Sequence, residues 1–161
     1  MSVITVYTDL VTLASTKEYL RIDTDITETD DEITQLINSA CNIIESYTQV
    51  YLKPRDITYF FNVRECARVY AFPINTITNE TSYTRTQRQL YSNFTTTDAS
   101  LDSITMNVGH TDTDDVKAIF IHAVQELVRQ WFYQSETESV NKGILPEKII
   151  QIVSQERRFI F

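Results

Sequence analysis

The chain has 161 residues, of which 42% are hydrophobic and 22% charged, so it can bury a core and lacks the composition of a disordered chain. Its formal net charge of −8 argues against a free-standing, non-specific nucleic-acid binder, because such a protein needs a basic face to displace counterions. No stretch has the apolar length that a membrane span requires, and the first residues lack a signal-peptide pattern. We therefore expect one domain with a modest appendage and no membrane partner.

The N-terminal third is expected to form two helices separated by an acidic connector. Thr12 is a suitable N-cap for a short helix over 13–21. Asp and Glu are frequent over 23–32, and the last three lie where a second helix begins, because negative charge there complements the helix dipole. This second helix is predicted to run to about residue 50, before Pro54. Its apolar residues recur at helical spacing: Ile33, Leu36, Ile37, Ala40, Ile43, Ile44 and Tyr47.

From about residue 57 to residue 108 the pattern is typical of strands. Aromatic and β-branched residues are frequent, and Pro73, Asn79 and Gly109 punctuate the runs. We expect a small antiparallel sheet or a long β-hairpin excursion here. The expected strands are 57–63, 68–72, 74–78, 83–86, 89–94 and 103–108.

A second long helix is predicted after the strands. Asp112 or Thr113 is expected to cap it. Its core-facing stripe consists of Val116, Phe120, Ala123, Val124, Leu127 and Trp131. The helix is long enough to lie along the one over 33–47, so the two together would supply the main core.

The predicted fold class is therefore α+β, mainly α. The expected architecture is a helical bundle of two long antiparallel helices plus short helices, with a small antiparallel β-sheet or hairpin insertion and a C-terminal docking arm. Residues 1–134 would form a single helical domain that includes the β insertion at about 57–108. Residues 135–161 would form a linker and the docking arm.

The sequence contains no recognised catalytic or metal-binding motif. His110 and His122 have no Ser, Cys, Asp or Glu at a motif spacing. The acidic run at 23–32 lacks the glycine of a calcium loop, and Thr34 stands where that loop has its last glutamate. We expect no catalytic residue, no metal site and no cofactor. A small metal-dependent hydrolase that uses the 23–32 carboxylates stays open as an alternative of a different class.

The C-terminal segment is the least usual feature of the sequence. It ends on Phe159-Ile-Phe161, apolar residues that would promote aggregation if they were exposed. These residues could fold back onto the domain's own core. Alternatively, residues 144–161 could be a docking arm for a partner, which the polar linker before them favours. The candidate docking residues are Ile144, Leu145, Ile149, Ile152, Val153, Arg157, Arg158, Phe159, Ile160 and Phe161.

Several short motifs of the sequence form a recognisable combination. They are Leu10-Val-Thr-Leu13, Lys17-Glu-Tyr-Leu-Arg-Ile-Asp23, Asp30-Asp-Glu-Ile33, Leu36-Ile37, Ala40, Ile44-Glu-Ser-Tyr-Thr48, Phe72-Pro-Ile74, Val116-Lys-Ala118, Trp131-Phe-Tyr133 and Leu145-Pro146 to Arg157-Arg158. Together they resemble the head–tail connector, or adaptor, proteins of long-tailed bacteriophages. The opening of about 50 residues carries most of the resemblance. Residues 75–108 match nothing in the family, and the proline usual before the last long helix is absent.

The resemblance implies a non-enzymatic virion protein at the head–tail interface, made in the host cytoplasm. Such proteins form a ring of roughly twelve copies beneath the portal and extend the DNA channel towards a stopper or tail-completion protein. The family's C-terminal segment reaches the portal, so residues 144–161 become the candidate portal-docking arm. A net acidic subunit suits a channel through which DNA passes without specific binding, because the like charges repel.

A ring subunit needs two lateral surfaces, so side chains off the main helix stripe are candidates for subunit contacts. Trp131-Phe-Tyr133 would either close the core or anchor an interface, with Arg129 beside it for an inter-subunit ion pair. The inter-subunit candidates are Ile119, His122, Arg129, Trp131 and Tyr133. Besides the hydrolase, the open alternatives are another neck or tail-completion protein and a regulatory binding module.

Overall fold

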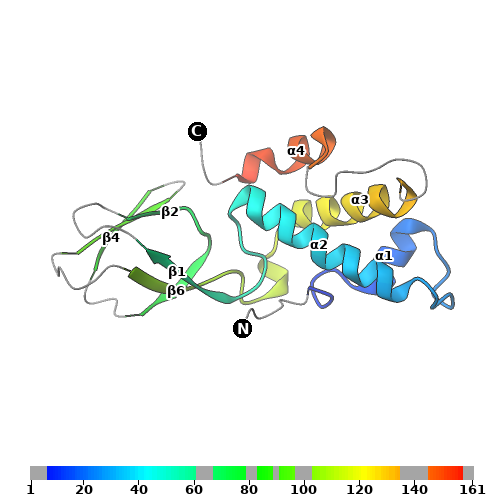
Figure 1. The fold of residues 1–161 in the computed structure, drawn as a ribbon, viewed down its shortest axis with the longest axis horizontal. Coiled ribbons are helices and arrows are strands. Elements are labelled where there is room, and N and C mark those ends of the chain that lie inside the picture. The colour runs from blue at the N-terminus through cyan, green and yellow to red at the C-terminus, as the bar shows by residue number, and fades with distance from the viewer. Residues whose placement is uncertain are drawn as a thin grey trace. The chain divides into compact units, whose positions relative to one another are not determined.

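A computed structural model of the chain describes residues 7–60, 67–78, 83–88, 91–96, 103–134 and 145–157. The chain divides into two compact units, and Figure 1 labels most of their helices and strands. The helical unit comprises residues up to 47 and residues 112–156, and the β unit comprises residues 48–111 with those from 157 onwards. Among the described residues, no helix is both long and apolar enough to cross a membrane.

The helical unit is built from four α-helices and two short 3-10 turns in the described ranges. Both α1 and α4 contact α3 (Figure 1). The elements are α1 (Leu13–Leu20), α2 (Asp30–Thr48), η2 (Thr113–Asp115), α3 (Ala118–Gln134), α4 (Glu147–Val153) and η3 (Ser154–Glu156).

Local signals in the sequence set the ends of α1. Thr12 caps the helix as predicted, because its Oγ1 accepts a hydrogen bond from the backbone N–H of Ser15 at 3.2 Å. The helix ends at Arg21, which adopts the left-handed conformation with φ 60° and donates its N–H to the Glu18 carbonyl. Asp112 caps η2 instead of α3, by accepting from the N–H of Asp114 at 3.0 Å.

The apolar stripes of α2 and α3 form the core of the helical unit. The predicted stripe of α2 is buried except that Ile43 and Tyr47 are half-buried. The N-terminal segment joins this core through Tyr7, whose hydroxyl donates to the buried Glu45 carboxylate at 2.7 Å. The largest core side chains of the unit are Tyr7, Leu20, Ile33, Ile37, Ile44, Phe120, Leu127 and Trp131.

The β unit consists of two three-stranded antiparallel sheets. One has the order β1-β6-β3, and the other has the order β2-β5-β4. The strands are β1 (Arg55–Phe60), β2 (Ala67–Val69), β3 (Ile74–Ile77), β4 (Thr84–Gln87), β5 (Ser92–Thr95) and β6 (Ser103–Val108). Each expected strand therefore overlaps an observed one, and β6 has the predicted bounds. Residues 61–63 and 89–90 of the expected strands lie outside the described residues.

A core of its own holds the β unit together. Alternate residues of β6 are buried, as expected when one face of a strand packs inward. They form one cluster with residues of the second sheet: Ala67, Val69, Ala71, Phe94, Ile104, Met106 and Val108. Gly109 follows β6 with φ 109°, where an added Cβ would lie 2.0 Å from the Lys53 carbonyl oxygen, so only glycine fits.

The predicted bundle of two long antiparallel helices is wrong. The structure is mixed α and β, with four α-helices and two three-stranded sheets among the described residues. The physical reason is that the strands bury enough apolar surface against each other to form a separate core. They do not form a small insertion attached to a helical core.

Candidate docking site on the helical unit

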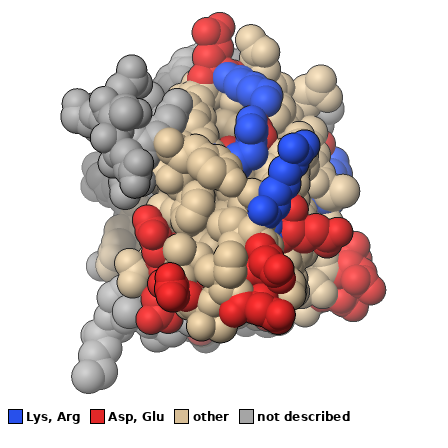
Figure 2. Space-filling model, turned by 90° about the vertical axis from the view of Figure 1, so that its right-hand side faces the viewer, with Lys and Arg blue, Asp and Glu red and all other residues tan. Residues whose placement is uncertain are grey.

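A polar pocket opens on the helical unit and is lined by residues of α1, α3 and α4. Its volume is about 650 Å³. The lining combines basic, aromatic and acidic side chains: Tyr19, Leu20, Arg21, Glu126, Arg129, Tyr133 and Lys148. We call it the basic pocket. Figure 2 shows Lys and Arg side chains gathered on one face of the molecule, with Asp and Glu side chains at its border.

Helical spacing brings three of the lining residues together. Glu126, Arg129 and Tyr133 are three and four residues apart on α3, so they lie on one side of that helix. The Tyr133 hydroxyl donates to the carbonyl of Leu20, the last residue of α1. The left-handed turn at Arg21 then ends α1 beside these side chains.

Glu126 is the centre of the pocket's hydrogen bonds, and only 6% of it is exposed. Its carboxylate accepts from the Tyr19 hydroxyl at 2.8 Å and from Arg129 Nε and Nη2 at 3.1 and 2.9 Å. Lys148 Nζ donates to the same carboxylate from α4. One buried carboxylate thus joins all three helices, which is the arrangement that satisfies a buried charge.

The network shifts the pKa of its members. The hydrogen bonds from Arg129, with those from Lys148 and Tyr19, lower the pKa of Glu126 to about 2, although burial opposes the shift. Burial and the bond to Glu126 raise the pKa of Tyr19, and Glu126 raises that of Arg129. Glu126 is therefore a permanent anion at neutral pH, suited to holding cations and unsuited to donating a proton.

The pocket has a surplus of positive charge. Its lining contains three cations, Arg21, Arg129 and Lys148, and one carboxylate, and the side chains of Arg129 and Lys148 remain 48% and 65% exposed. The described helical unit as a whole is strongly acidic, with fifteen Asp and Glu residues against five Lys and Arg. A positive pocket on an acidic unit can bind carboxylates of a partner molecule, because Arg and Lys still have free donors for them.

The predicted inter-subunit residues occupy different environments. Arg129 and Tyr133 line the basic pocket. His122 is exposed, with its ring 6.2 Å from that of Tyr19, and Ile119 is half-buried. Trp131 is only 2% exposed and packs inside the helical unit.

The described part of the predicted docking arm packs on its own unit. Leu145, Ile149 and Val153 are buried, and α4 contacts α3. Ile152 and Arg157 are half-buried. The remaining candidates, Ile144, Arg158, Phe159, Ile160 and Phe161, lie outside the described residues.

One carboxylate of the hydrolase alternative already has a partner. Lys17 binds the Asp30 carboxylate at 2.8 Å. The ring of His110 lies 6.3 Å from that of Phe72. Within the described ranges, no group of three or more His, Cys, Asp or Glu residues is placed to hold a metal ion.

Sequence reasoning missed Glu126, Arg21 and Lys148. A signal for Glu126 was present in the sequence, because Glu126 and Arg129 are the two charged residues of their helix and are spaced i, i+3. Nothing local pointed to Lys148, since its partner lies 22 residues earlier in the chain.

The sequence matches no known protein family and no curated protein. The fold, however, is similar over its whole length to solved structures. One is the neck of an empty gene transfer agent (GTA) particle computed with C6 symmetry, with a TM-score of 0.76 and 15% identity. Others are the virion of a native GTA particle, at 0.72 and 14%, and the neck of a native GTA particle computed with C12 symmetry, at 0.70 and 13%. Each comparison covers 100% of this chain and 96% of the other, so the expected resemblance to phage connector proteins is confirmed in the fold.

Proposed function

We propose that this chain is a structural protein of a virion neck, and that it forms the adaptor ring beneath the portal. The observation that carries the proposal is the full-length similarity of its fold to chains in three solved structures of GTA particles. Two of these structures are of the particle neck, and the third is of the virion. Two of those structures were computed with C6 and C12 symmetry, which supports a ring of copies. In this role the protein extends the DNA channel towards a stopper or tail-completion protein, and it makes or breaks no covalent bond.

The basic pocket supports an assembly role. Its accessible cations, held in place by Glu126, offer a docking surface for an acidic segment of a partner. Arg129 and Tyr133 would act there as subunit contacts. Because Ile149 and Val153 of α4 are buried in their own unit, portal docking would rest on the segment 157–161.

Native mass spectrometry of the purified chain, alone and mixed with the portal protein of the same particle, tests the proposal. We expect a multimer of roughly twelve copies on the portal. A chain that stays monomeric with and without the portal would contradict it. Deleting residues 158–161 should abolish portal binding, whereas Glu147→Ala, at an exposed position of α4, should leave it intact.

The fold similarity also supports a second role for this chain, that of a different neck component, because the similar structures are of whole necks and a whole virion. A tail-completion protein would bind the neck's tail-side components and ignore the portal. The same mass spectrometry, repeated with a tail-side component in place of the portal, separates the two roles.

A further inference from the structure

The connector between α1 and α2 presents an apolar side chain among carboxylates. Ile26 is 46% exposed, so part of its apolar side chain is accessible to a partner. Asp23, Asp25 and Glu28, on either side of it, are exposed as well. We name residues 23–28 the acidic knob.

Hydrogen bonds fix the conformation of the acidic knob. The buried Lys17 donates from Nζ to the carbonyls of Thr24, at 2.9 Å, and Ile26, and to the Asp30 carboxylate. The N–H of Ile26 donates to the Asp23 carbonyl at 3.2 Å. A segment ordered in this way loses little conformational entropy when it binds.

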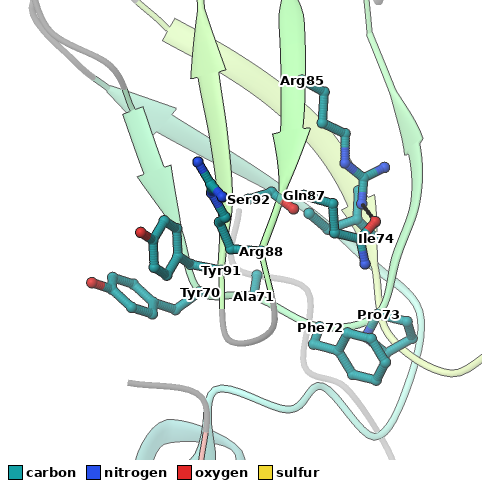
Figure 3. A pocket seen from close by; sticks show the side chains of 10 residues that line it. All are labelled: Tyr70, Ala71, Phe72, Pro73, Ile74, Arg85, Gln87, Arg88, Tyr91 and Ser92. Atoms are coloured by element: carbon teal, nitrogen blue, oxygen red, sulfur yellow. Dashed lines mark hydrogen bonds between the residues drawn. The ribbon is translucent and has the colours of Figure 1, made fainter. Parts of the chain in front are cut away.

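The β unit has a pocket of complementary character where β4 turns into β5, with a volume of about 230 Å³. We name it the aromatic pocket. Its apolar lining is formed by Tyr70, Phe72, Pro73, Ile74 and Tyr91. The rings of Tyr70 and Tyr91 lie 5.7 Å apart, and Figure 3 shows them on one side of the pocket, with Phe72 and Pro73 at its end.

Two arginines give the aromatic pocket its charge. Arg85 and Arg88 are exposed and line the pocket, and both are labelled in Figure 3. Arg85 donates to the Gln87 side chain at 3.2 Å, and no described carboxylate forms an ion pair with either arginine. Both therefore have donors available for a carboxylate ligand.

The wall of the aromatic pocket is fixed by backbone pairing. The N–H of Phe72 donates to the Gln49 carbonyl at 3.1 Å, and the Phe72 carbonyl accepts from Tyr51 at 2.7 Å. Arg88 donates its N–H to the Tyr91 carbonyl at 2.8 Å and closes the turn. The pocket is thus preformed, as binding sites usually are.

The charges of the two units are opposite in sign. Among the described residues of segment 48–111, five Lys and Arg residues stand against Asp56 alone, whereas the helical unit has fifteen acidic residues against five basic ones. Over the whole segment 48–111 the balance is six basic to five acidic. An acidic ligand for the aromatic pocket is therefore abundant on a second copy of this chain.

We propose that the acidic knob of one copy docks into the aromatic pocket of the next copy. Ile26 enters between the tyrosines and Phe72, and the knob's carboxylates face Arg85 and Arg88. Tyrosine and arginine, with tryptophan, are enriched among the residues that contribute most of the binding energy at protein interfaces. The contact uses two different surfaces of one chain, so it is head-to-tail and can close into a ring. It deepens the proposed function and rests on it.

Charge reversal tests the contact. Asp25→Lys with Glu28→Lys reverses the knob, and Arg85→Glu with Arg88→Glu reverses the pocket. We expect each double variant to lose the ring in native mass spectrometry on the portal, and the quadruple variant to regain it. Mixing the two double variants should also restore the ring, with the variants alternating, because the acidic knob of one meets the arginine pocket of the other and the lysine knob meets the glutamate pocket. Glu18→Lys with Asp115→Lys, also at exposed positions, is the matched control and should keep the ring.

Ile26→Asn checks the apolar part of the contact without disturbing the fold. Lys17 binds the Ile26 backbone carbonyl, which the substitution keeps, so the melting temperature should not change while the ring is lost. Rings in every variant would overturn the contact and leave the proposed function standing. A wild-type chain that forms no ring with the portal would remove both.

Discussion

The ammonium of Lys17 lies 2.8 Å from a carboxylate oxygen of Asp30, thirteen residues later, and the lysine is 2% exposed. A buried lysine is expensive unless every donor finds a partner, and here two backbone carbonyls accept the remaining hydrogens. The pair therefore explains why an acidic connector can be ordered between α1 and α2.

Replacing this lysine should destabilise the helical unit. Lys17→Met leaves Asp30 and two carbonyls without their donor, and we expect a loss of about 2–3 kcal/mol in the free energy of unfolding. Urea denaturation measures it. Lys117→Met removes the exposed pair with Glu156 instead and should cost under about 1 kcal/mol. Equal effects of the two substitutions would refute the structural role of Lys17.

Stability should fall in acid partly because of Glu126. Its folded pKa of about 2 lies below the ordinary value of 4.5, so its contribution is present above pH 4.5 and is lost as the pH falls towards 2. The contribution is of the order of 1–3 kcal/mol. Urea unfolding of the wild type and of Glu126→Gln across this range measures it, since other carboxylates cancel in the difference. A difference that does not change with pH would show that Glu126 carries no such shift.

Gly109 should tolerate no side chain. Gly109→Ala places a Cβ 2.0 Å from the Lys53 carbonyl oxygen at a φ of 109°, so backbone must move. We expect a loss of at least about 2 kcal/mol, seen as a lower melting temperature. Thr111→Ala, at an exposed position two residues later, is the control. A melting temperature unchanged by Gly109→Ala would mean that the turn after β6 is placed differently.

The helix α4 should behave as core. Ile149 is fully buried, so Ile149→Ala should lower the free energy of unfolding by about 2–5 kcal/mol, whereas Glu147→Ala should have little effect. Chemical denaturation of the two variants shows whether α4 is part of the core of the helical unit or part of a free docking arm. If Ile149→Ala left stability unchanged and lost portal binding alone, α4 would be part of a free docking arm.

The sequence predicted local structure well because the signals were local. The stripe of α2, the Thr12 cap and the alternation in β6 are each set by residues within a few positions. The sheet order could not be predicted in this way. In β6, Val108 pairs with both Arg55 and Ile74, and no local pattern selects those partners over others.

In the basic pocket, too, the sequence indicated the local features but not the long-range contacts. Arg129 and Tyr133 were predicted as subunit contacts because they lie at an aromatic helix end, whereas Glu126, whose carboxylate binds Arg129, was not predicted. Its hydrogen bond to Tyr19 spans 107 residues, so only the folded chain shows why it is there. The aromatic pocket likewise combines residues 70–74 with residues of β4 and β5. No local pattern in the sequence predicts that these two segments meet.

The measurement that most directly tests the central claim is native mass spectrometry of the wild-type chain with the portal protein of its particle. The adaptor account predicts a closed multimer of roughly twelve copies bound to the portal. A monomer that does not bind the portal would contradict it.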